Sequence, residues 1–408
     1  MAEIFAGISG VFMFFSSVSV RVMRKRLFLA LSLKSAFLSA AVLSGPEEYI
    51  WLLAVFAGIV FVFFSMIVYT GGNKKSGNAA KGAAAVFMLC LIFSFWGCGN
   101  EEKKVLKMPE VKSSLNLKFT PSVLLAAPGK KLYVGSERKN RVYRYNMKNG
   151  KIEDIIATGK YPYDMMLDKE VLYTANSRGA NVTVYDTKSG ETNNIRTRGS
   201  YPSAVALSGN KKKLYAANRG SGNVSVIDLE KKKSVKRVST GKWPSGLYID
   251  DEEMYLYVAC KYTNTVEIID TATDELILTK IDAGISPILI LEADKNDILI
   301  ISEWKYSYNQ KGSVIVMDKR DFFIKKTIMT EGGASDALVS KSKKYIYLAM
   351  PLEDMIVFMD YESGKEMHRI VFEDLMPKWL ALSADGKFLY ATTQKDDKIH
   401  TIALNGLI

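Results

Sequence analysis

The sequence predicts an all-β protein made of repeated small sheets and preceded by apolar helical segments. Between Gly199 and Gly241, four short apolar runs alternate with Gly, Asn, Ser and Lys, namely Ala204–Leu207, Leu214–Ala217, Val224–Ile227 and Val235–Val238. Runs this short, rich in Val, Ile and Tyr and bounded by turn residues, predict strands rather than helices. One sheet of four strands cannot bury both of its faces, so we expect it to stack on copies of itself.

The chain supplies these copies. The proline that opens the first strand recurs every 40 to 43 residues, except for one interval of 48 residues that ends at Ser335, which takes the equivalent place in its unit; these prolines are Pro121, Pro162, Pro202, Pro244, Pro287 and Pro377. The third strand recurs as NVTVYD, NVSVID, TVEIID, SVIVMD and MIVFMD. Its terminal Asp is expected to accept backbone N–H bonds in the following turn. A period near 40 residues with four strands per unit is typical of a β-propeller, and seven units predict seven blades.

Two stretches carry a family resemblance. LYAANRGSGNVSVID and LYVACKYTNTVEIIDTATDEL resemble the YVTN-type β-propeller repeat, and all seven units from about residue 121 to 408 show some form of it. The resemblance implies a seven-bladed propeller of the WD-repeat-like and lactonase-like superfamily. It does not imply one activity, because this scaffold serves binding proteins, surface proteins and enzymes.

The last unit ends soon after its third strand, so it lacks an outer strand of its own. Apolar and polar residues alternate in LNLKFT near residue 115. We therefore expect residues 113–119 to supply the missing strand and close the ring, which removes open sheet edges. Residues 99–112 are polar and are predicted to be a linker, so the propeller domain is expected to cover residues 113–408.

Residues 1–98 are predicted to be a hydrophobic membrane-anchor region of up to four helices. The stretch 49–70 is long enough to cross a bilayer. Basic residues cluster at 21–26 and 74–81. If both clusters lie in the cytoplasm, the four apolar segments cross the membrane in alternating directions and leave the propeller outside it. The remainder of the chain holds 47 Lys or Arg against 40 Asp or Glu, a balance too small to argue for nucleic acid.

A second interpretation covers the end of this region. Residues 74–98 resemble a bacterial lipoprotein signal, with lysines, an apolar run and then Gly97 and Cys98, although Trp96 stands where a small residue is usual. Cys98 is then the predicted lipidation site. Both interpretations, lipoprotein and membrane-spanning anchor, place the propeller in the periplasm or at the surface of a bacterial cell.

Candidate ligand-binding residues fall on one face. In a propeller, the loop entering the inner strand and the loop between the second and third strands open on the same side. Aromatic residues flank the prolines in the first loop and basic residues recur in the second, giving the candidates Tyr161, Tyr201, Trp243, Trp379, Arg138, Arg178, Arg219, Lys261 and Lys305. Trp304 lies in the longest of these loops. Cations alternating with rings suit an anionic or sugar-bearing polymer. The same residues are also compatible with simple packing between blades.

Signals for catalysis are weak. The sequence has two His and three Cys, with no metal-ligand spacing and no nucleophile motif, so we predict no catalytic residue, metal or cofactor. Asp164, Glu292 and Asp336 lie on predicted inner strands and could face the channel, although such carboxylates are more often solvated or hydrogen-bonded to neighbouring blades.

The sequence therefore predicts a non-catalytic binding or scaffold module of the cell envelope, with an envelope protein or an anionic or glycan polymer as partner. A propeller hydrolase such as a lactonase, and nucleic-acid binding through the basic loops, remain alternatives.

Overall fold

The computed structural model describes residues 108–250, 252–294, 296–302 and 311–408. The predictions for the anchor region, for Cys98 and for Trp304 and Lys305 fall outside these residues. Within them, no helix is long and apolar enough to cross a membrane. The described residues contain 28 strands and one short 3-10 helix, η1 (Ser177–Gly179).

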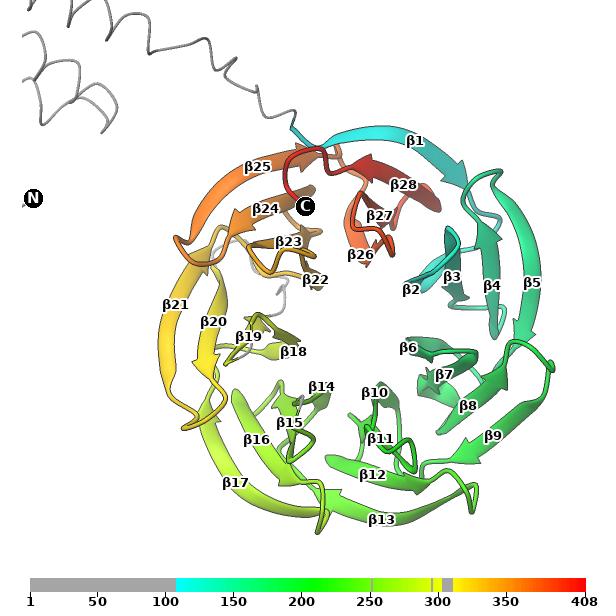
Figure 1. The fold of residues 1–408 in the computed structure, drawn as a ribbon, viewed down its shortest axis with the longest axis vertical. Helices are drawn as coiled ribbons and strands as arrows, with labels where there is room; N and C mark the ends of the chain where they lie inside the picture. Colours follow the sequence, from blue (N-terminus) through cyan, green and yellow to red (C-terminus); the bar gives the residue numbers. More distant parts are fainter. Residues whose placement is uncertain (1–107, 251, 295, 303–310) are drawn as a thin grey trace, which may run out of the picture. The chain divides into compact units, whose positions relative to one another are not determined.

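The strands form seven sheets of four antiparallel strands, arranged around a common axis (Figure 1), as the repeat predicts. Blades 1 to 3 comprise β2 (Pro121–Ala127), β3 (Lys131–Ser136), β4 (Arg141–Asn146) and β5 (Lys151–Ala157); β6 (Pro162–Asp168), β7 (Val171–Asn176), β8 (Asn181–Asp186) and β9 (Thr192–Arg196); and β10 (Pro202–Leu207), β11 (Lys213–Asn218), β12 (Asn223–Asp228) and β13 (Lys233–Ser239). Blades 4 and 5 comprise β14 (Pro244–Ile249), β15 (Tyr255–Cys260), β16 (Thr265–Asp270) and β17 (Glu275–Asp282); and β18 (Pro287–Glu292), β19 (Asp297–Ser302), β20 (Gly312–Asp318) and β21 (Ile324–Thr330). Blade 6 comprises β22 (Asp336–Val339), β23 (Tyr345–Met350), β24 (Met355–Asp360) and β25 (Lys365–Val371).

Blade 7 is assembled from both ends of the described chain. It combines β26 (Pro377–Leu382), β27 (Phe388–Thr393) and β28 (Lys398–Ala403) with β1 (Glu110–Asn116), which pairs antiparallel with β28. The ring is therefore closed by a strand from before the first blade, as expected, but that strand begins three residues earlier than 113 and ends before Leu117. Leu117 instead packs into the core between blades 7 and 1, because the chain turns inward there.

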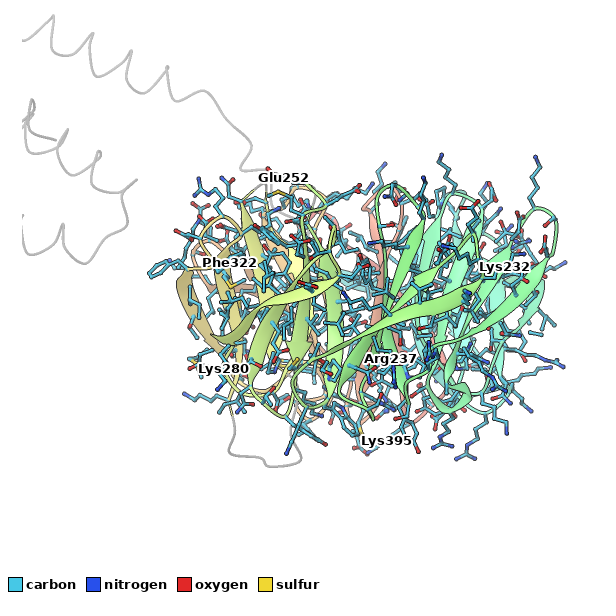
Figure 2. The ribbon with its side chains drawn as sticks, turned by 90° about the horizontal axis from the view of Figure 1, so that it is seen from below. Lys232, Arg237, Glu252, Lys280, Phe322 and Lys395 are labelled. Carbon is cyan, nitrogen blue, oxygen red and sulfur yellow. The ribbon has the colours of Figure 1, made fainter. Side chains whose placement is uncertain are left out.

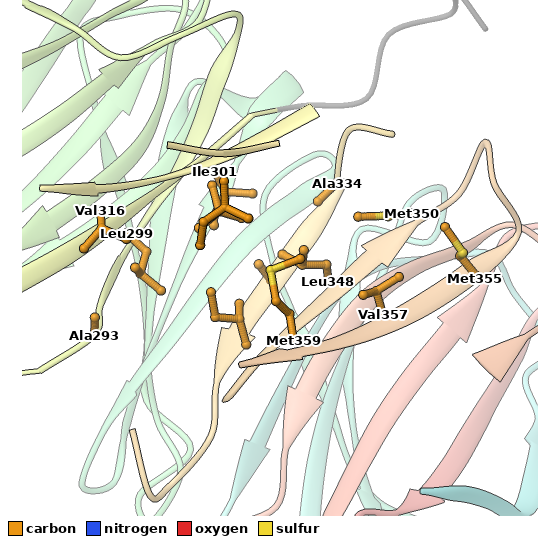
Figure 3. Close-up of a cluster of buried hydrophobic side chains, with 14 residues drawn as sticks. Ala293, Leu299, Ile301, Val316, Ala334, Leu348, Met350, Met355, Val357 and Met359 are labelled. Carbon is orange, nitrogen blue, oxygen red and sulfur yellow. The ribbon is translucent and has the colours of Figure 1, made fainter. Parts of the chain in front are cut away.

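The hydrophobic core is divided among the gaps between blades. Each gap is filled by side chains from two neighbouring sheets, and Figure 3 shows the cluster between blades 5 and 6, where Leu299 and Ile346 have no exposed surface. The second and third strands are apolar on both faces because each blade packs against a blade on either side. This explains the uninterrupted apolar runs, which an antiparallel sheet exposed on one side would not show.

Hydroxyl groups bond the inner strands of neighbouring blades. Ser122, Ser203 and Ser245, each following a proline, donate to the proline carbonyl of the next blade, namely to Pro162 (2.6 Å), Pro244 (2.9 Å) and Pro287 (3.2 Å). In blade 6, Ser335 donates to the carbonyl of Lys378 (2.7 Å), the residue after Pro377. Asp336 has the same register position as Asp164, which lies two residues after Pro162, so Ala334 stands at the proline position and the predicted equivalence of Ser335 is wrong by one residue.

The third strand ends as predicted. The terminal carboxylates of Asp186, Asp228, Asp270 and Asp360 accept backbone N–H bonds of 2.8 to 2.9 Å from residues two or three positions further on. These bonds lower the pKa of Asp186, Asp270 and Asp360, and at Asp228 they act together with the Lys231 side chain. They also fix the turns on the side of the ring where the third strands end.

Candidate functional site

The two loops that carry the candidate residues meet on one side of the ring. The N–H of Ser177 donates to the carbonyl of Tyr161 (2.8 Å), Arg219 N–H to Tyr201 (3.1 Å) and Lys261 N–H to Trp243 (3.0 Å). We call this side, formed by the loops before the inner strands and between the second and third strands, the mouth face. The expectation that both loops open on the same side is confirmed.

The backbone before each inner strand has a positive φ. It is 62° at Tyr161, 54° at Tyr201 and 62° at Trp243, and Ser286 and Met376 adopt the same conformation before their prolines. A positive φ is unusual for a bulky residue. The side chain of Asn140 stabilises it at Tyr161 by accepting that residue's N–H (3.1 Å). Since Ser and Met also occupy this turn, the turn geometry does not itself require an aromatic residue.

A guanidinium on the mouth face lies against two aromatic rings. The guanidinium carbon of Arg219 lies 4.3 Å from the ring centroid of Tyr163 and 5.4 Å from that of Trp243. One of its terminal nitrogens donates to Ser177 Oγ (3.1 Å). Arg219 belongs to blade 3, Tyr163 to blade 2 and Trp243 to the loop entering blade 4, so this contact joins three blades.

Two further rings extend the group. Trp379 from blade 7 meets Tyr163 edge to face at 5.9 Å, although blade 1 separates their blades along the ring. Tyr262 packs on Trp243 at 4.8 Å. We call Tyr163, Arg219, Trp243, Tyr262 and Trp379 the mouth cluster. Within the described residues, Nε of Arg219 and Nε1 of Trp379 are buried and have no hydrogen-bond partner.

Most of the predicted candidates lie in or beside this cluster. Arg178 is exposed and lies 4.9 Å from the ring of Tyr161, which itself stacks on Tyr163 at 6.1 Å; Lys261 lies 5.4 Å from the ring of Tyr262. Two candidates stand apart. Arg138 is exposed on the loop of blade 1, and Tyr201 is 50% exposed; no ring or cation contact joins either of them to the cluster among the described residues.

Sequence reasoning missed two of the central residues, Tyr163 and Tyr262. Tyr163 directly follows Pro162, at the position where Ser122, Ser203 and Ser245 bond to the next blade. This departure from the repeat was visible in the sequence and could have identified it. Tyr262 follows a predicted basic residue in a variable loop, and no comparable signal marks it.

Two half-buried carboxyls lie on the inner strands of blades 2 and 6. Asp164 and Asp336 occupy the same register position on β6 and β22, opposite Ala175 and Ala349. Each accepts an N–H from the next blade, from Val205 and Leu380 respectively, at 2.8 Å. Burial raises the pKa of Asp164 to about 6 and that of Asp336 to about 7, the latter also through repulsion from Asp164, although both residues keep some exposed surface.

These bonds show that both carboxyls connect neighbouring blades, which is the structural role expected from the sequence. Glu292 differs, because it lies at the far end of β18 and pairs with Lys343 (3.3 Å). The raised pKa values would allow Asp164 and Asp336 to exchange protons near neutral pH, so they could serve as an acid and a base toward a ligand in the channel.

The sixth blade carries negative charge where other blades carry cations. Glu353 lies in its loop between the second and third strands, and its Oε2 is buried without a hydrogen-bond partner among the described residues. Burial raises the pKa of Glu353, and the nearby Glu331 and Asp354 add to this effect. The mouth face is therefore cationic and aromatic over blades 2 to 4 and acidic at blade 6.

The other reactive residue types are structural. Cys260 is fully buried, and burial raises the pKa of its thiol to about 12, so the thiolate is not formed at neutral pH. His400 bonds Ser114 (2.9 Å) and Thr393 (3.0 Å) inside blade 7. In the part of the chain that the structure describes, no group of three or more His, Cys, Asp or Glu could hold a metal ion.

Comparison with known proteins agrees with the fold. The sequence model of the family described as "Lactonase, 7-bladed beta-propeller" matches residues 191–287 and 301–406. Tyr163 and Asp164 lie outside the matched residues. No curated protein matches. The solved structure of "Kuenenia stuttgartiensis Hydrazine Synthase" has a TM-score of 0.60 with this chain at 16% identity, and the match covers 71% of this chain and 97% of that one. The chain is thus a seven-bladed β-propeller similar to the lactonase propeller family.

Proposed function

We propose that this protein is a non-catalytic binding module of the bacterial cell envelope that presents the mouth cluster to an anionic glycan polymer. The observation that supports this most is the stacking of Arg219 between Tyr163 and Trp243, which joins three blades in one aromatic and cationic surface. Rings on a rigid scaffold are suited to the faces of sugar rings, and the adjacent cations to carboxylate or phosphate groups.

The cluster has a fixed part and an adaptable part. Arg219 is held by two rings and by Ser177, so it sets the positions of the rings rather than reaching for a ligand. Arg178 is exposed above Tyr161 and is placed to contact an anion directly. The unpartnered N–H groups of Arg219 and Trp379 would gain acceptors if a hydroxylated ligand displaced the rings slightly.

Binding of two polysaccharides of similar length tests the proposal. A uronic-acid polymer should bind the protein more tightly than an uncharged glucan. Trp243→Ala should weaken binding of both polymers, because it removes a stacking surface, whereas Arg178→Glu should weaken only the charged one. Lys365→Glu, an exposed position on the outer strand β25 and outside both loop faces, is the matched control. Unchanged binding of the uronic-acid polymer by both mouth variants would contradict the proposal.

The predicted anchor belongs to the same proposal. The protein would be held outside the cytoplasmic membrane by the hydrophobic region, either through a lipid on Cys98 or through membrane-spanning segments. The mass of the mature N-terminus distinguishes the two forms. A lipidated protein would begin at Cys98 with added acyl mass, and a spanning anchor would retain the upstream residues.

A hydrolase remains the second candidate, because the matching family is described as a lactonase and because Asp164 and Asp336 have raised pKa values. If the channel catalyses lactone hydrolysis, Asp336→Asn should abolish turnover of a simple sugar lactone while leaving polymer binding intact. A wild-type protein that does not accelerate hydrolysis over buffer removes this candidate.

A further inference from the structure

We infer that the side of the ring opposite the mouth face carries a second binding surface, one that docks on an anionic lipid bilayer. This side is formed by the loops between the first and second strands and between the third and fourth strands of each blade. Over blades 6, 7, 1, 2 and 3 these loops are rich in exposed lysines. We call this set the lysine arc: Lys130, Lys148, Lys169, Lys188, Lys211, Lys212, Lys231, Lys232, Lys341, Lys343, Lys344 and Lys387.

The arc and the mouth cluster face in opposite directions. Because the strands of each blade are antiparallel, loops that follow the first and third strands lie at the end of the ring away from loops that follow the second. Figure 2 shows this separation, with Glu252, from a loop after a first strand, and Lys395, from a loop after a second strand, at opposite edges of the ring. The two surfaces can therefore bind different partners at the same time.

The charge of this side is uneven around the ring. The equivalent described loops of blade 4 carry no lysine or arginine and contain the acids Asp250, Glu252, Glu253 and Asp274. Blade 5 adds Lys319 and Arg320 in its loop between the third and fourth strands, so blade 4 is the exception among the described loops of this side. This asymmetry gives the propeller one basic sector that can approach a negatively charged plane.

Many arc lysines are available to an external anion. Lys211, Lys231, Lys232 and Lys343 do pair with carboxylates of the ring, at 2.7 to 3.4 Å, yet their side chains remain 43 to 62% exposed. Exposed pairs of this kind are weak and exchange readily with other ions. Lys148, Lys188 and Lys212 are exposed at loop positions and form no ion pair among the described residues.

The entry point of the chain indicates which anion. β1 begins opposite the end of β28, with Glu110 paired to Ala403, and Asn405 donates a hydrogen bond to the Met108 carbonyl (2.7 Å). The polypeptide thus enters the ring on the side of the lysine arc, at blade 7, which is one of the five blades that carry the arc. Residues 99–107, which connect this point to the proposed anchor, can reach at most roughly 30 Å when extended.

This inference rests on the proposed membrane anchor for its choice of partner. For a chain that enters on this side, the arc is the basic surface nearest to the point of attachment, and each lysine close to lipid headgroups adds to the attraction.

Vesicle binding by the isolated propeller tests the inference. Residues 106–408 contain all seven blades and the closing strand, so the ring is complete without the upstream region. This fragment should sediment with vesicles of phosphatidylcholine and phosphatidylglycerol at low salt, and not with vesicles of phosphatidylcholine alone. The triple variant Lys148→Glu, Lys188→Glu and Lys212→Glu should lower the partition coefficient by at least about tenfold.

The control is the triple variant Lys139→Glu, Lys160→Glu and Lys242→Glu, which reverses three exposed lysines on the mouth side. It should retain vesicle binding. Equal loss in both variants, equal binding to both vesicle types, or stronger binding to duplex DNA than to anionic vesicles at the same salt concentration would overturn the inference. If the Glu variants melt at lower temperature than the wild type, the corresponding Gln variants replace them, with a smaller expected loss. The fragment lacks residues 1–105, so its failure is distinguishable from a failure of the proposed anchor.

Discussion

The two ends of the ring hold their cations in different ways. On the mouth face, Arg219 lies between two rings and bonds to Ser177, and Arg178 lies over Tyr161. In the lysine arc on the opposite side, the cations are lysines that extend into solvent or pair with exposed or half-buried carboxylates. The guanidinium is flat and stacks on rings, whereas the ammonium group is a compact, strongly hydrated charge.

The mouth cluster is therefore a surface of fixed shape, whereas the lysine arc is a surface of mobile charges. Stacked arginine and aromatic side chains have lost their freedom before any ligand arrives, so they favour a ligand of matching shape. Mobile lysines attract any anionic plane and respond strongly to salt. The following experiments test the contrast, beginning with the closed ring on which both surfaces depend.

Removal of the closing strand should have the largest effect. Deleting residues 106–116 from the propeller leaves the edge of β28 unpaired and removes the partner of blade 7, so the melting temperature should fall by more than about 10 °C. Both binding surfaces should then be lost together. Thermal unfolding followed by circular dichroism provides the measurement, and a melting curve that coincides with that of the parent fragment would contradict the closure.

The channel acids should make stability depend on pH. Asp164 and Asp336 have folded-state pKa values raised to about 6 and about 7, so the folded protein holds protons that the unfolded chain has already released. The contribution of these two groups to the unfolding free energy should therefore be highest near pH 4 and should decline as the pH rises through 7.

Because of this pair, the unfolding free energy should decline by roughly 2 kcal/mol over this pH range. This is less than full burial would give, because both carboxyls keep some exposed surface. Asp336→Asn should flatten the profile of unfolding free energy measured by urea titration between pH 5 and pH 8. At low pH the two protonated carboxyls would no longer carry negative charge that offsets the positive charge of the mouth cluster. An unaltered profile in the variant would show that Asp336 is ionised throughout.

Truncation of one cation on each side tests the contrast directly. Arg219→Ala removes contacts with Tyr163, Trp243 and Ser177 and should lower the unfolding free energy by about 1–2 kcal/mol. Lys212→Ala should change it by less than about 0.5 kcal/mol, since Lys212 is an exposed loop residue. Urea unfolding of both variants is the measurement. Similar losses from the two variants would mean that the stacking of Arg219 adds nothing to stability.

A smaller effect than that of Arg219→Ala is expected at the junction of the two chain ends. Ser114→Ala removes the hydrogen bond between β1 and His400 and should lower the unfolding free energy by about 0.5–1.5 kcal/mol. Ser114→Thr, which retains the hydroxyl, should behave nearly as the wild type. A loss of the same size in both variants would indicate crowding at this position rather than a lost hydrogen bond.

The sequence could predict most of the fold and about half of the candidate site. Proline, the Leu-Tyr pair and the terminal Asp recur because each has the same local task in every blade. Arg178, Arg219 and Trp243 were found because they recur too. Tyr163 was not found, since it departs from the serine of its sister units, and a departure is recognised only when the contact it replaces is known.

The sequence by itself determined the number of blades, the strand boundaries near the prolines and the closure by an upstream strand. These follow from local periodicity and from the need to cover every apolar face and sheet edge. Only the tertiary structure decided which blades meet at the mouth. Trp379 and Tyr163 are separated by more than 200 residues, and they touch because the ring brings blade 7 near blade 2. The same closure brings the entry of the chain to the lysine-rich side, and no local pattern records that placement.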